Sequence, residues 1–447
     1  GFEADDERLL DPAPYLEKEG IDLSFEVVDS GKSQANLYML HLQNEKEQIR
    51  VEAVSSGGGM VEIIQMENSR VSIQGDYHET LIYSHDELFL ESFGRDLAWI
   101  SDVLLHKGEN PFIEIRSRQQ AEKAWLMEVE NIPAVHAVRT IAPVLPVLSG
   151  SKRSLPFSSY EQMKKFNLEN KYEAWQLALE YEAARGDLSR EQVRTLMEDR
   201  YRIIRQGLES GLSGTHFKDR IFGPQSLKYG KVLEQGSLSK DESLHKITLY
   251  VSALMEVKSS MGTIVAAPTA GSCGTFPGAV LGVADSLGKD EEEVVNALLA
   301  GSLVGLFIAA DATFSAEIGG CQAECGSGSG MAASAIVYLL GGSVEQSMSA
   351  ASMALQNSLG MICDPIAARV EAPCLGKNIS SAANALSCAN LAMAGYDHLI
   401  PLDEVIETMD KVGKSLPREL RCTALGGLAI TPTAKGIEER LRRGNSE

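Results

Sequence analysis

The chain has 447 residues, which is more than one compact core usually holds, so two or three domains are expected. Hydrophobic residues make up 44% and charged residues 23%, values typical of a packed globular protein, and they exclude disorder as the starting interpretation. The formal net charge of -21 at pH 7 makes nucleic acids and anionic membrane surfaces poor partners, because like charges repel.

The start of the chain and its apolar runs indicate where the protein resides. The sequence opens on Gly1 without the basic and apolar segments of a secretory signal, so we expect a cytoplasmic protein. The longest apolar run, from Val294 to Ala310, is at the short limit for a bilayer span and has charges on both sides, at Glu293 and Asp311. We predict that this run is a buried helix and that the protein has no membrane partner.

The first part of the chain has the pattern of a sheet. From Ile21 to Ile82, apolar and polar residues often alternate, as in Ile49, Val51 and Ala53, and the segment from Ser55 to Gly59 interrupts the alternation. Alternation with a period of two, broken by Ser and Gly, predicts strands joined by a turn. The stretch that follows is mixed in character.

A break near residues 145–157 separates this part from a helical one. Pro143, Pro146 and Gly150 end regular structure there, and the later residues, rich in Ala, Gly, Ser and Met, favour closely packed helices. Helical periodicity runs through Tyr160 to Leu168, Tyr172 to Ala184 and Ser189 to Leu208. We therefore predict an α+β protein, with a small N-terminal α/β domain and linker over residues 1–150 and a large, mainly α-helical domain over 157–447.

The cysteines are the residues most suggestive of chemistry. All seven lie from Cys273 onward, which favours free thiols, some of them ligands, over a disulfide framework. Three of them stand beside Gly or Pro at chain reversals, namely Cys321, Cys363 and Cys374. Their spacing, C-x41-C-x10-C, is not that of zinc ribbons or ferredoxins, and by spacing alone they are more typical of buried small hydrophobic residues.

Several motifs together resemble a known family, the iron-sulfur-dependent L-serine dehydratases. The resemblance runs in collinear order from about Pro156 to Leu441. It is carried by Ser210 to Leu212, Met261 to Gly274, Gly319 to Ala332, Cys363 to Ala367, Val370 to Cys374, Lys377-Asn378 with Asn384, Asp403 to Ile406 and Gly426 to Ala429. It implies elimination of water from L-serine to give pyruvate and ammonia, with a 4Fe-4S cluster held by Cys321, Cys363 and Cys374. Three ligands leave one iron able to bind substrate as a Lewis acid.

The N-terminal domain is similar, more weakly, to the family's small regulatory subunit or domain. Gly1 to Asp6 and the turn from Ser55 to Gly59 carry that likeness. The family's Ser-Ser-Ser-His segment is missing, which indicates that the N-terminal part of this domain is absent or has diverged.

Candidate substrate-binding and catalytic residues lie in Gly-rich segments. The loop of Thr269, Ala270 and Gly271 offers a hydroxyl and backbone N–H groups to a substrate carboxylate, or simply caps a helix. The resemblance makes Ser210, Ser213 and Asn378 further candidates for the substrate pocket. Lys258 and His216 are candidates for the base that removes the α-proton, and an exposed Lys258 paired with an acidic residue is the alternative.

The remaining cysteines and three departures from the family pattern leave questions open. Cys325, one helical turn from Cys321, is interpreted as a spare core thiol, Cys388 as core, and Cys273 as a neighbour of substrate or as packing under its loop; Cys422 lies near the Gly426-Gly427 turn. Asp311, Lys258 and Thr215-His216 replace residues usual in the family, so a substrate other than serine is an open alternative.

Several other functions compete with serine dehydration. The same scaffold could act on threonine or cysteine, the protein could be a non-catalytic iron-sulfur sensor, or three thiols could belong to a structural zinc site. Pyridoxal phosphate chemistry is not favoured, because no lysine with a phosphate-binding glycine loop is evident. The expected partner is a small amino acid substrate, and a homodimer is the expected assembly for an enzyme of this size.

Overall fold

The computed structural model describes residues 6–28, 31, 36–57, 60–94, 97–145, 148 and 155–444. Contacts divide the chain into two compact units. The β unit comprises Lys32–Leu155 and Tyr181–Val193, and the helical unit comprises Gly1–Gly31, Pro156–Glu180 and Arg194–Glu447. The α+β fold class is confirmed. The domain bounds 1–150 and 157–447 stay a prediction, since the units group the opening segment and residues 181–193 differently.

Three predicted features fall partly or wholly on residues outside those described. They are the family likeness at Gly1 to Asp6, of which only Asp6 is described, the tip of the Ser-Gly turn at residues 58 and 59, and most of the linker, including Pro146 and Gly150.

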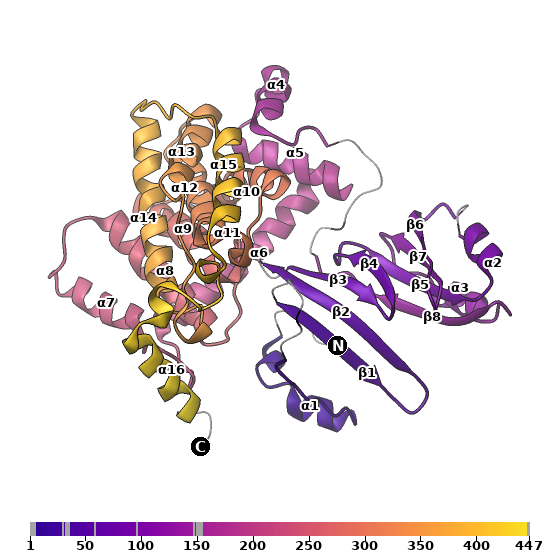
Figure 1. Ribbon diagram of the computed structural model, residues 1–447. Coiled ribbons are helices and arrows are strands. Elements are labelled where there is room, and N and C mark those ends of the chain that lie inside the picture. Colours follow the sequence, from indigo (N-terminus) through magenta and orange to yellow (C-terminus); the bar gives the residue numbers. More distant parts are fainter. Residues whose placement is uncertain are drawn as a thin grey trace. The chain divides into compact units, whose positions relative to one another are not determined.

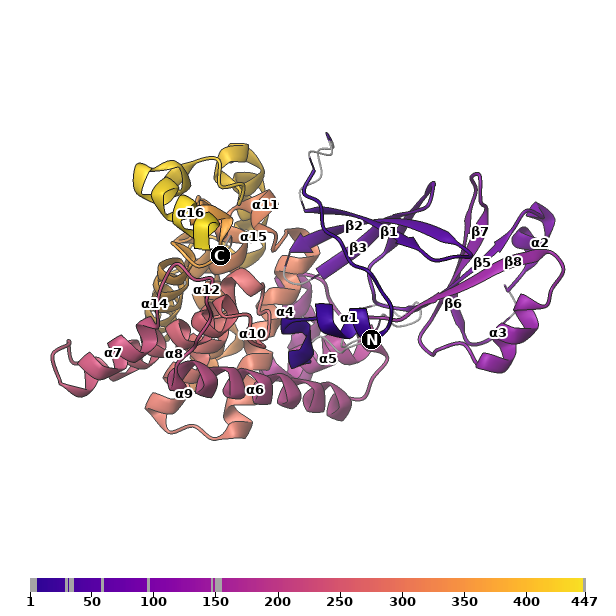
Figure 2. The same ribbon diagram turned by 90° about the horizontal axis from the view of Figure 1, so that it is seen from below.

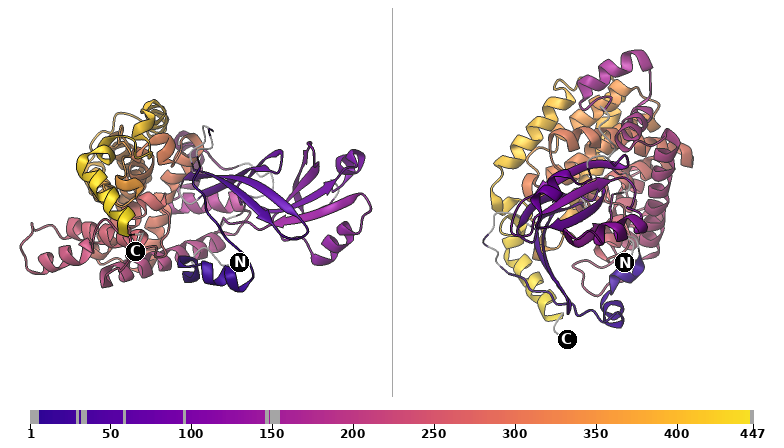
Figure 3. Two further views of the ribbon diagram at one scale, coloured as in Figure 1. Left: turned by 60° about the horizontal axis from the view of Figure 1, so that its bottom comes forward. Right: turned by 90° about the vertical axis from the view of Figure 1, so that its right-hand side faces the viewer.

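The first sheet of the β unit is a four-stranded antiparallel meander in the order β1-β2-β3-β4. Its strands are β1 (Leu37–Gln43), β2 (Gln48–Gly57), β3 (Met60–Met66) and β4 (Ser69–Ile73), and Figure 3 shows the long β1–β2 pair from two sides. Val51 and Ala53 are buried at alternate positions of β2, which confirms the strands predicted on either side of the Ser-Gly segment. The same prediction is wrong for Ile21 to Val28, which forms no strand and leaves Phe25 and Val27 exposed.

The second sheet, in the order β6-β7-β5-β8, accounts for the α/β character of this unit. It contains β5 (His78–Ser84), β6 (Ile100–His106), β7 (Phe112–Ser117) and β8 (Val135–Ile141), with helices α2 (Glu87–Ser92) and α3 (Lys123–Glu130). Ile82 and Ile113 pack with Leu90 of α2 and Val129 of α3, whereas Leu81 packs against residues of the first sheet. Because β7 is buried on both faces, it lacks the alternation that identifies a half-exposed strand.

A buried carboxylate lies within this β core. Glu79 on β5 is 1% exposed, and among the described residues neither of its carboxylate oxygens has a hydrogen-bond partner. Arg116 lies 3.6 Å from Glu79 Oε1 but binds Glu114 more closely, at 2.6 Å. Burial, followed by the negative charge of Glu114, raises the pKa of Glu79 to about 8.

We predict that Glu79→Gln stabilises the β unit at pH 8 more than at pH 5. The raised pKa means that the folded state holds this proton more tightly, so stability is lost as pH rises from the ordinary value of 4.5 towards 8. The neutral amide avoids that loss, with an expected gain on the order of 1–3 kcal/mol at pH 8. Urea unfolding followed by Trp fluorescence in a Trp175→Phe background reports this unit, which retains Trp99 and Trp125. Glu128→Gln, at an exposed site on α3, is the control; equal effects of both changes would contradict the prediction.

The helical unit is built around α12, which packs against α9, α10, α13 and α14 (Figure 1). Its helices are α1 (Ala13–Lys18), α4 (Tyr160–Asn170), α5 (Ala174–Gly186, whose end belongs to the β unit), α6 (Arg190–Ser213, whose start does), α7 (Gln225–Glu234), α8 (Glu242–Ser259), α9 (Thr275–Leu287), α10 (Glu291–Asp311), α11 (Ala316–Gly319), α12 (Ser327–Leu339), α13 (Val344–Gln356), α14 (Cys374–Met393), α15 (Leu402–Ser415) and α16 (Pro432–Gly444). Short turns of helix are η1 (Glu7–Leu10), η2 (Ala270–Ser272), η3 (Gln322–Gly326), η4 (Ile366–Ala368), η5 (Arg418–Leu420) and η6 (Gly427–Ile430). The three helices predicted between residues 160 and 208 are confirmed as α4, α5 and α6.

Small residues let these helices approach closely, as their composition predicts. On α9, a Cβ added at Gly278 would lie 2.7 Å from Val251 of α8, and one at Gly282 would lie 2.7 Å from the backbone of Ile247. The two helices lie side by side in Figures 1 and 2. Alanine at either glycine would therefore push α8 and α9 apart.

The apolar run from Val294 to Ala310 forms most of α10, and most of it is buried, as predicted. Asp290 caps the helix, accepting a hydrogen bond from the backbone of Glu293, whose side chain accepts one in return. By length and composition α10 could also cross a membrane, but 72% of its most apolar window is buried in the protein, as in a core helix.

Candidate functional site

Cys321 is positioned by a tight approach of three chain segments. Gly320 before it has a φ of 71°, and a Cβ there would lie 2.8 Å from Leu416 and 2.9 Å from the carbonyl oxygen of Met361. Only glycine fits this place. The chain then enters η3, a turn of π-helix of the kind that is frequent at functional sites, which carries Glu324 and Cys325 towards the same interior.

Cys363 is held by backbone pairing with the C-terminal part of the chain. Its N–H donates to the carbonyl oxygen of Leu420 (2.9 Å), and its own carbonyl accepts from the N–H of Cys422 (3.1 Å). Cys422 has a φ of 55°, a left-handed conformation that costs energy outside glycine. The next residue, Asp364, accepts hydrogen bonds from Lys377 Nζ (2.6 Å) and from the N–H of Leu428 (2.8 Å). The Gly426 to Ala429 motif is thereby fixed to the Cys363 segment.

Cys374 opens α14, and Asn378 fixes the start of that helix. Asn378 is fully buried, and its Nδ2 donates to the carbonyl oxygens of Cys374 and Gly271, both at 2.9 Å. Its Oδ1 accepts from the N–H (3.0 Å) and the hydroxyl (2.8 Å) of Thr275. This one amide therefore ties the Cys374 helix to the Thr269 loop and to the first turn of α9.

The predicted ligand thiols meet in one buried group. Cys321 Sγ, Cys363 Sγ and a carboxylate oxygen of Glu324 all lie within 4.8 Å of one another. Hydrogen bonds from the thiols of Cys325 and Cys363 hold the pKa of Cys321 well below its usual range. Burial and then the charge of Cys321 raise the pKa of Cys374, whose carbonyl accepts from the same Asn378 amide that contacts the Cys325 sulfur.

Two further cysteines belong to this thiol group. Cys325 contacts Cys321, and its sulfur lies 3.5 Å from Asn378 Nδ2. Cys422 packs against Cys363. Cys325, interpreted from the sequence as a spare core thiol, is buried but is also a neighbour of the ligand candidates. Cys388 lies in the core of α14, as predicted.

The Thr269 loop contacts the thiol group through Glu324. Thr269 Oγ1 donates to Glu324 Oε1 (2.6 Å) and also accepts from the N–H of Ser272 (3.1 Å), so it both caps η2 and faces the candidate site. Gly271 is buried against the Glu324 carboxylate, whereas Ala270 is exposed. Burial, followed by the charge of Cys321, raises the pKa of Glu324 to about 8. Cys273, whose position under its loop was left open, is buried against Met255.

Lys258 and His216, the two candidate bases, lie in different surroundings. Lys258 lies in the last turn of α8 and donates a hydrogen bond to the carbonyl oxygen of Val370, and its positive charge partly offsets the rise in the pKa of Cys374. His216 is exposed and lines a separate pocket of about 420 Å³ with Lys218 and Phe222. Only Lys258 is therefore brought to the thiol group.

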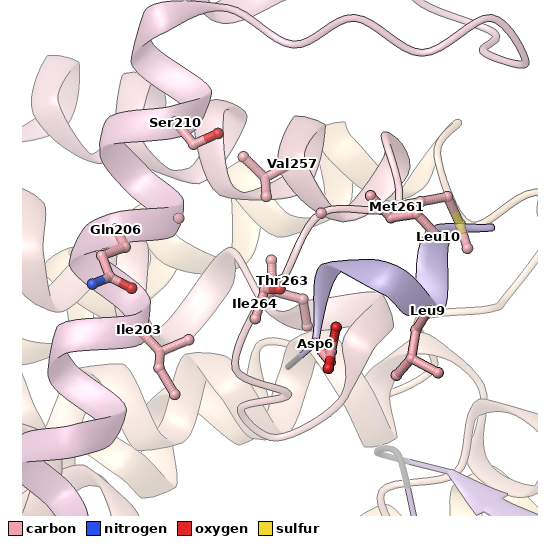
Figure 4. Close-up of a pocket in the computed structure, with 12 residues that line it drawn as sticks. Asp6, Leu9, Leu10, Ile203, Gln206, Ser210, Val257, Met261, Thr263 and Ile264 are labelled. Carbon is pink, nitrogen blue, oxygen red and sulfur yellow. The ribbon is translucent and has the colours of Figure 1, made fainter. Parts of the chain in front are cut away.

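The two candidate serines on α6 also lie elsewhere. Ser210 is exposed and lines a pocket of about 550 Å³ between α6, the loop after α8 and the Asp6–Leu10 segment (Figure 4). Ser213 is exposed and donates to the carbonyl oxygen of Glu209 (2.8 Å). Of the departures from the family pattern, Asp311 is exposed at the end of α10, and Thr215 contacts Arg220 at 3.4 Å.

Several charged residues that the sequence did not single out as site residues lie around the thiol group. Lys377 lies between Asp364 and Cys321, with Nζ 3.9 Å from the sulfur. Glu371 accepts hydrogen bonds from Arg220 Nε (2.6 Å) and from the backbone N–H groups of Ile221 and Phe222. Glu324 lies between two cysteines in the GGCQAEC motif, and this was the signal that could have identified it.

The sequence matches a protein family and several known proteins. The sequence model of the family described as "Serine dehydratase alpha chain" matches residues 169–429. The chain is 39% identical over 254 residues to the probable L-serine dehydratase alpha chain of Bacillus subtilis, covering 57% of this chain and 84% of the relative. It is 45% identical over 189 residues to that of Latilactobacillus sakei, covering 42% and 90%. With the L-serine dehydratase TdcG of Escherichia coli it shares 38% identity over 241 residues, 52% of each chain.

A helical unit with a buried thiol group, a lysine and a carboxylate defines a candidate enzyme site of the thiol-ligated metal class. The matched region contains every residue of that group. The chain belongs to the serine dehydratase alpha chain family.

We predict that Asn378→Ala destabilises the helical unit and reduces metal binding. The substitution removes the hydrogen-bond partner of the Gly271 and Cys374 carbonyls and of the Thr275 N–H. This loss should lower the free energy of unfolding by about 2–4 kcal/mol. The apparent melting temperature and the metal content after anaerobic purification measure the effect. Asn390→Ala, at an exposed position of the same helix, is the control. A normal metal content in Asn378→Ala would show that this amide does not organise the site.

Proposed function

We propose that the protein is an L-serine ammonia-lyase that converts L-serine to pyruvate and ammonia and depends on a 4Fe-4S cluster. The convergence of buried thiols from three chain segments is the observation that carries the proposal. The names of the relatives supply the substrate. The chain spans about half of the Escherichia coli relative, so the activity of that whole protein comes to this chain as part of the proposal.

Cys321, Cys363 and Cys374 would hold the cluster. Their sulfurs suit a thiophilic metal centre, and they are buried where solvent would not compete. When bound, the cluster would supply a Lewis acid for the hydroxyl and carboxylate of the substrate. Lys377 offsets the negative charge of Cys321, and Asp364 holds Lys377 in place.

The proposed reaction also requires a base that removes the α-proton of the substrate. Elimination removes the α-hydrogen as a proton and the β-hydroxyl as water; the resulting aminoacrylate becomes an imine and is hydrolysed to the 2-oxo acid and ammonia. Lys258 is our candidate for the base, since the carbonyl of Val370 holds its Nζ beside the Cys374 segment. The Thr269 loop is our candidate for binding the substrate carboxylate.

Threonine and cysteine are the rival substrates. Product analysis separates them, since threonine gives 2-oxobutyrate and cysteine releases sulfide. A non-catalytic sensor would bind iron and release no ammonia from any amino acid. We further propose a homodimer in the cytoplasm, without nucleic acid or membrane as partner.

The anaerobically purified protein should be brown and contain about four iron atoms per chain. Cys321→Ser, Cys363→Ser or Cys374→Ser should abolish both iron binding and turnover, whereas Cys388→Ser should preserve them. Iron and sulfide analysis, with absorption spectroscopy, measures iron binding. Ammonia release from L-serine measures turnover. Stoichiometric zinc without iron would refute the cluster. Loss of iron in Cys325→Ser or Cys422→Ser would add that thiol to the ligand set.

Replacing Lys258 by Ala should lower turnover roughly 10²- to 10⁴-fold, the usual contribution of a general base, while the iron content stays normal. It should also stop exchange of the substrate α-hydrogen with deuterated water, if the native enzyme shows that exchange. His216→Ala, at an exposed site away from the thiol group, should remain active. If His216→Ala loses turnover and Lys258→Ala keeps it, the assignment is reversed.

A further inference from the structure

The loop between α6 and α7 forms a pocket that the proposed reaction does not use. The pocket has a volume of about 420 Å³, and every residue that lines it lies between Thr215 and Pro224. The dipeptide Thr215-His216 is one of the departures from the family pattern, so the resemblance to the family does not account for this loop. The pocket is therefore a candidate for a second binding site on the helical unit.

The charges that line this pocket are positive. Lys218 is exposed and has no hydrogen-bond or ion-pair partner within the described part of the chain. Arg220 adds a second cation, and none of the described residues that line the pocket is acidic. Asp219, which lies between the two in sequence, pairs with Arg369 at 2.6 Å. In a chain with a net charge of -21, a lysine without a partner beside an arginine favours an anionic ligand.

The guanidinium of Arg220 is fixed before any ligand binds. Its side chain is only 8% exposed, Nε donates to Glu371 (2.6 Å), and Nη1 donates to Ser260 (2.6 Å). Nη2 has no hydrogen-bond partner among the described residues, and it is accessible to solvent rather than buried. Because Arg220 lines the pocket, this free donor is available to a ligand there. A donor that is already held in place loses little conformational entropy on binding.

The backbone of the loop offers little to a phosphate group. Phosphates typically bind at helix N-termini or where several free backbone N–H groups point at them. Here the two N–H groups that follow Arg220 donate to Glu371, and those of Gln225 and Ser226, which start α7, donate to Glu256. The pocket is left with side-chain donors, which suit a carboxylate.

The balance of charge and the apolar walls narrow the ligand further. Glu371 neutralises Arg220, so the charge of Lys218 remains for a ligand with a single negative charge. Phe217 and Phe222 supply apolar surface in the same pocket. We propose that this pocket binds a small organic carboxylate, which accepts hydrogen bonds from Arg220 and Lys218 while its apolar part packs against the two phenylalanines. None of these residues belongs to the thiol group, so the inference does not rest on the proposed function.

Benzoate tests the proposal, because it combines one carboxylate with an apolar ring. Benzamide has the same shape without the charge, and inorganic phosphate is an anion without the ring. Titrations of the 447-residue chain, followed through the NMR signals of the ligand, should show benzoate binding at least about 10-fold more tightly than benzamide, the effect of a hydrogen bond to a charged group. Phosphate should bind more weakly than benzoate. No binding of benzoate, equal binding of benzamide, or tighter binding of phosphate would overturn the inference.

Lys218→Ala should weaken benzoate binding roughly 5-fold, as expected for the loss of an exposed ion pair. Lys228→Ala is the matched control, because it removes the same charge from an exposed position on α7 outside the pocket; it should change the affinity less than about 2-fold. Both lysines are exposed, so neither substitution should change the melting temperature. Phe217→Ala should weaken benzoate binding about 3-fold or more. Equal effects of the two lysine substitutions, or no effect of Phe217→Ala, would place benzoate elsewhere and overturn the inference.

Discussion

The candidate site depends on one buried side-chain amide. Asn378 uses both its donor and its acceptor atoms, joining the Cys374 helix to the Gly271 carbonyl and to the first residue of α9. An aspartate could not donate to the two carbonyls, and an alanine would leave all the partners unsatisfied. Together with the hydrogen bond from Thr269 to Glu324, this amide connects the predicted cluster ligands to the predicted substrate loop.

Two buried carboxylates, Glu371 and Glu256, also join separate segments of the helical unit. Glu371, three residues before Cys374, accepts hydrogen bonds from the Arg220 side chain and from the two backbone N–H groups that follow Arg220. Glu256 on α8 accepts hydrogen bonds from the N–H (2.9 Å) and the hydroxyl (2.6 Å) of Ser226. The loop between α6 and α7 is thereby attached both to the Cys374 segment and to the end of α8 that carries Lys258. The segments that carry Lys258 and Cys374 are therefore connected through this loop and the start of α7.

The sequence could predict features that depend on neighbouring residues, but not contacts between segments that are far apart in the chain. Gly320 and Pro373 mark chain reversals beside Cys321 and Cys374, but only the resemblance to a known family singled these cysteines out as ligands. Cys422 could not be placed, because its contact with Cys363 arises from backbone pairing between segments about 60 residues apart. Ser210 and His216 were expected at the site, and in the structure both side chains are exposed, Ser210 on α6 and His216 in the segment after that helix.

The same reasoning explains the β unit. Alternation up to Ile82 identified β2, β3 and most of β5, but not β7, which is buried on both faces and carries Glu114 inward. The opening segment from Ile21 to Val28 has a strand-like pattern without a partner strand among the described residues. Periodicity reports which faces can be buried, and only tertiary contacts decide whether they are.

The acidity of the chain bears on how the proposed amino acid substrate would be bound. At neutral pH an amino acid such as serine is a zwitterion without net charge, so the overall charge of -21 neither attracts nor repels it appreciably. Recognition must then come from local charges on opposite sides of the bound molecule. Under the proposed function, the Thr269 loop and the metal would face the carboxylate of the bound molecule.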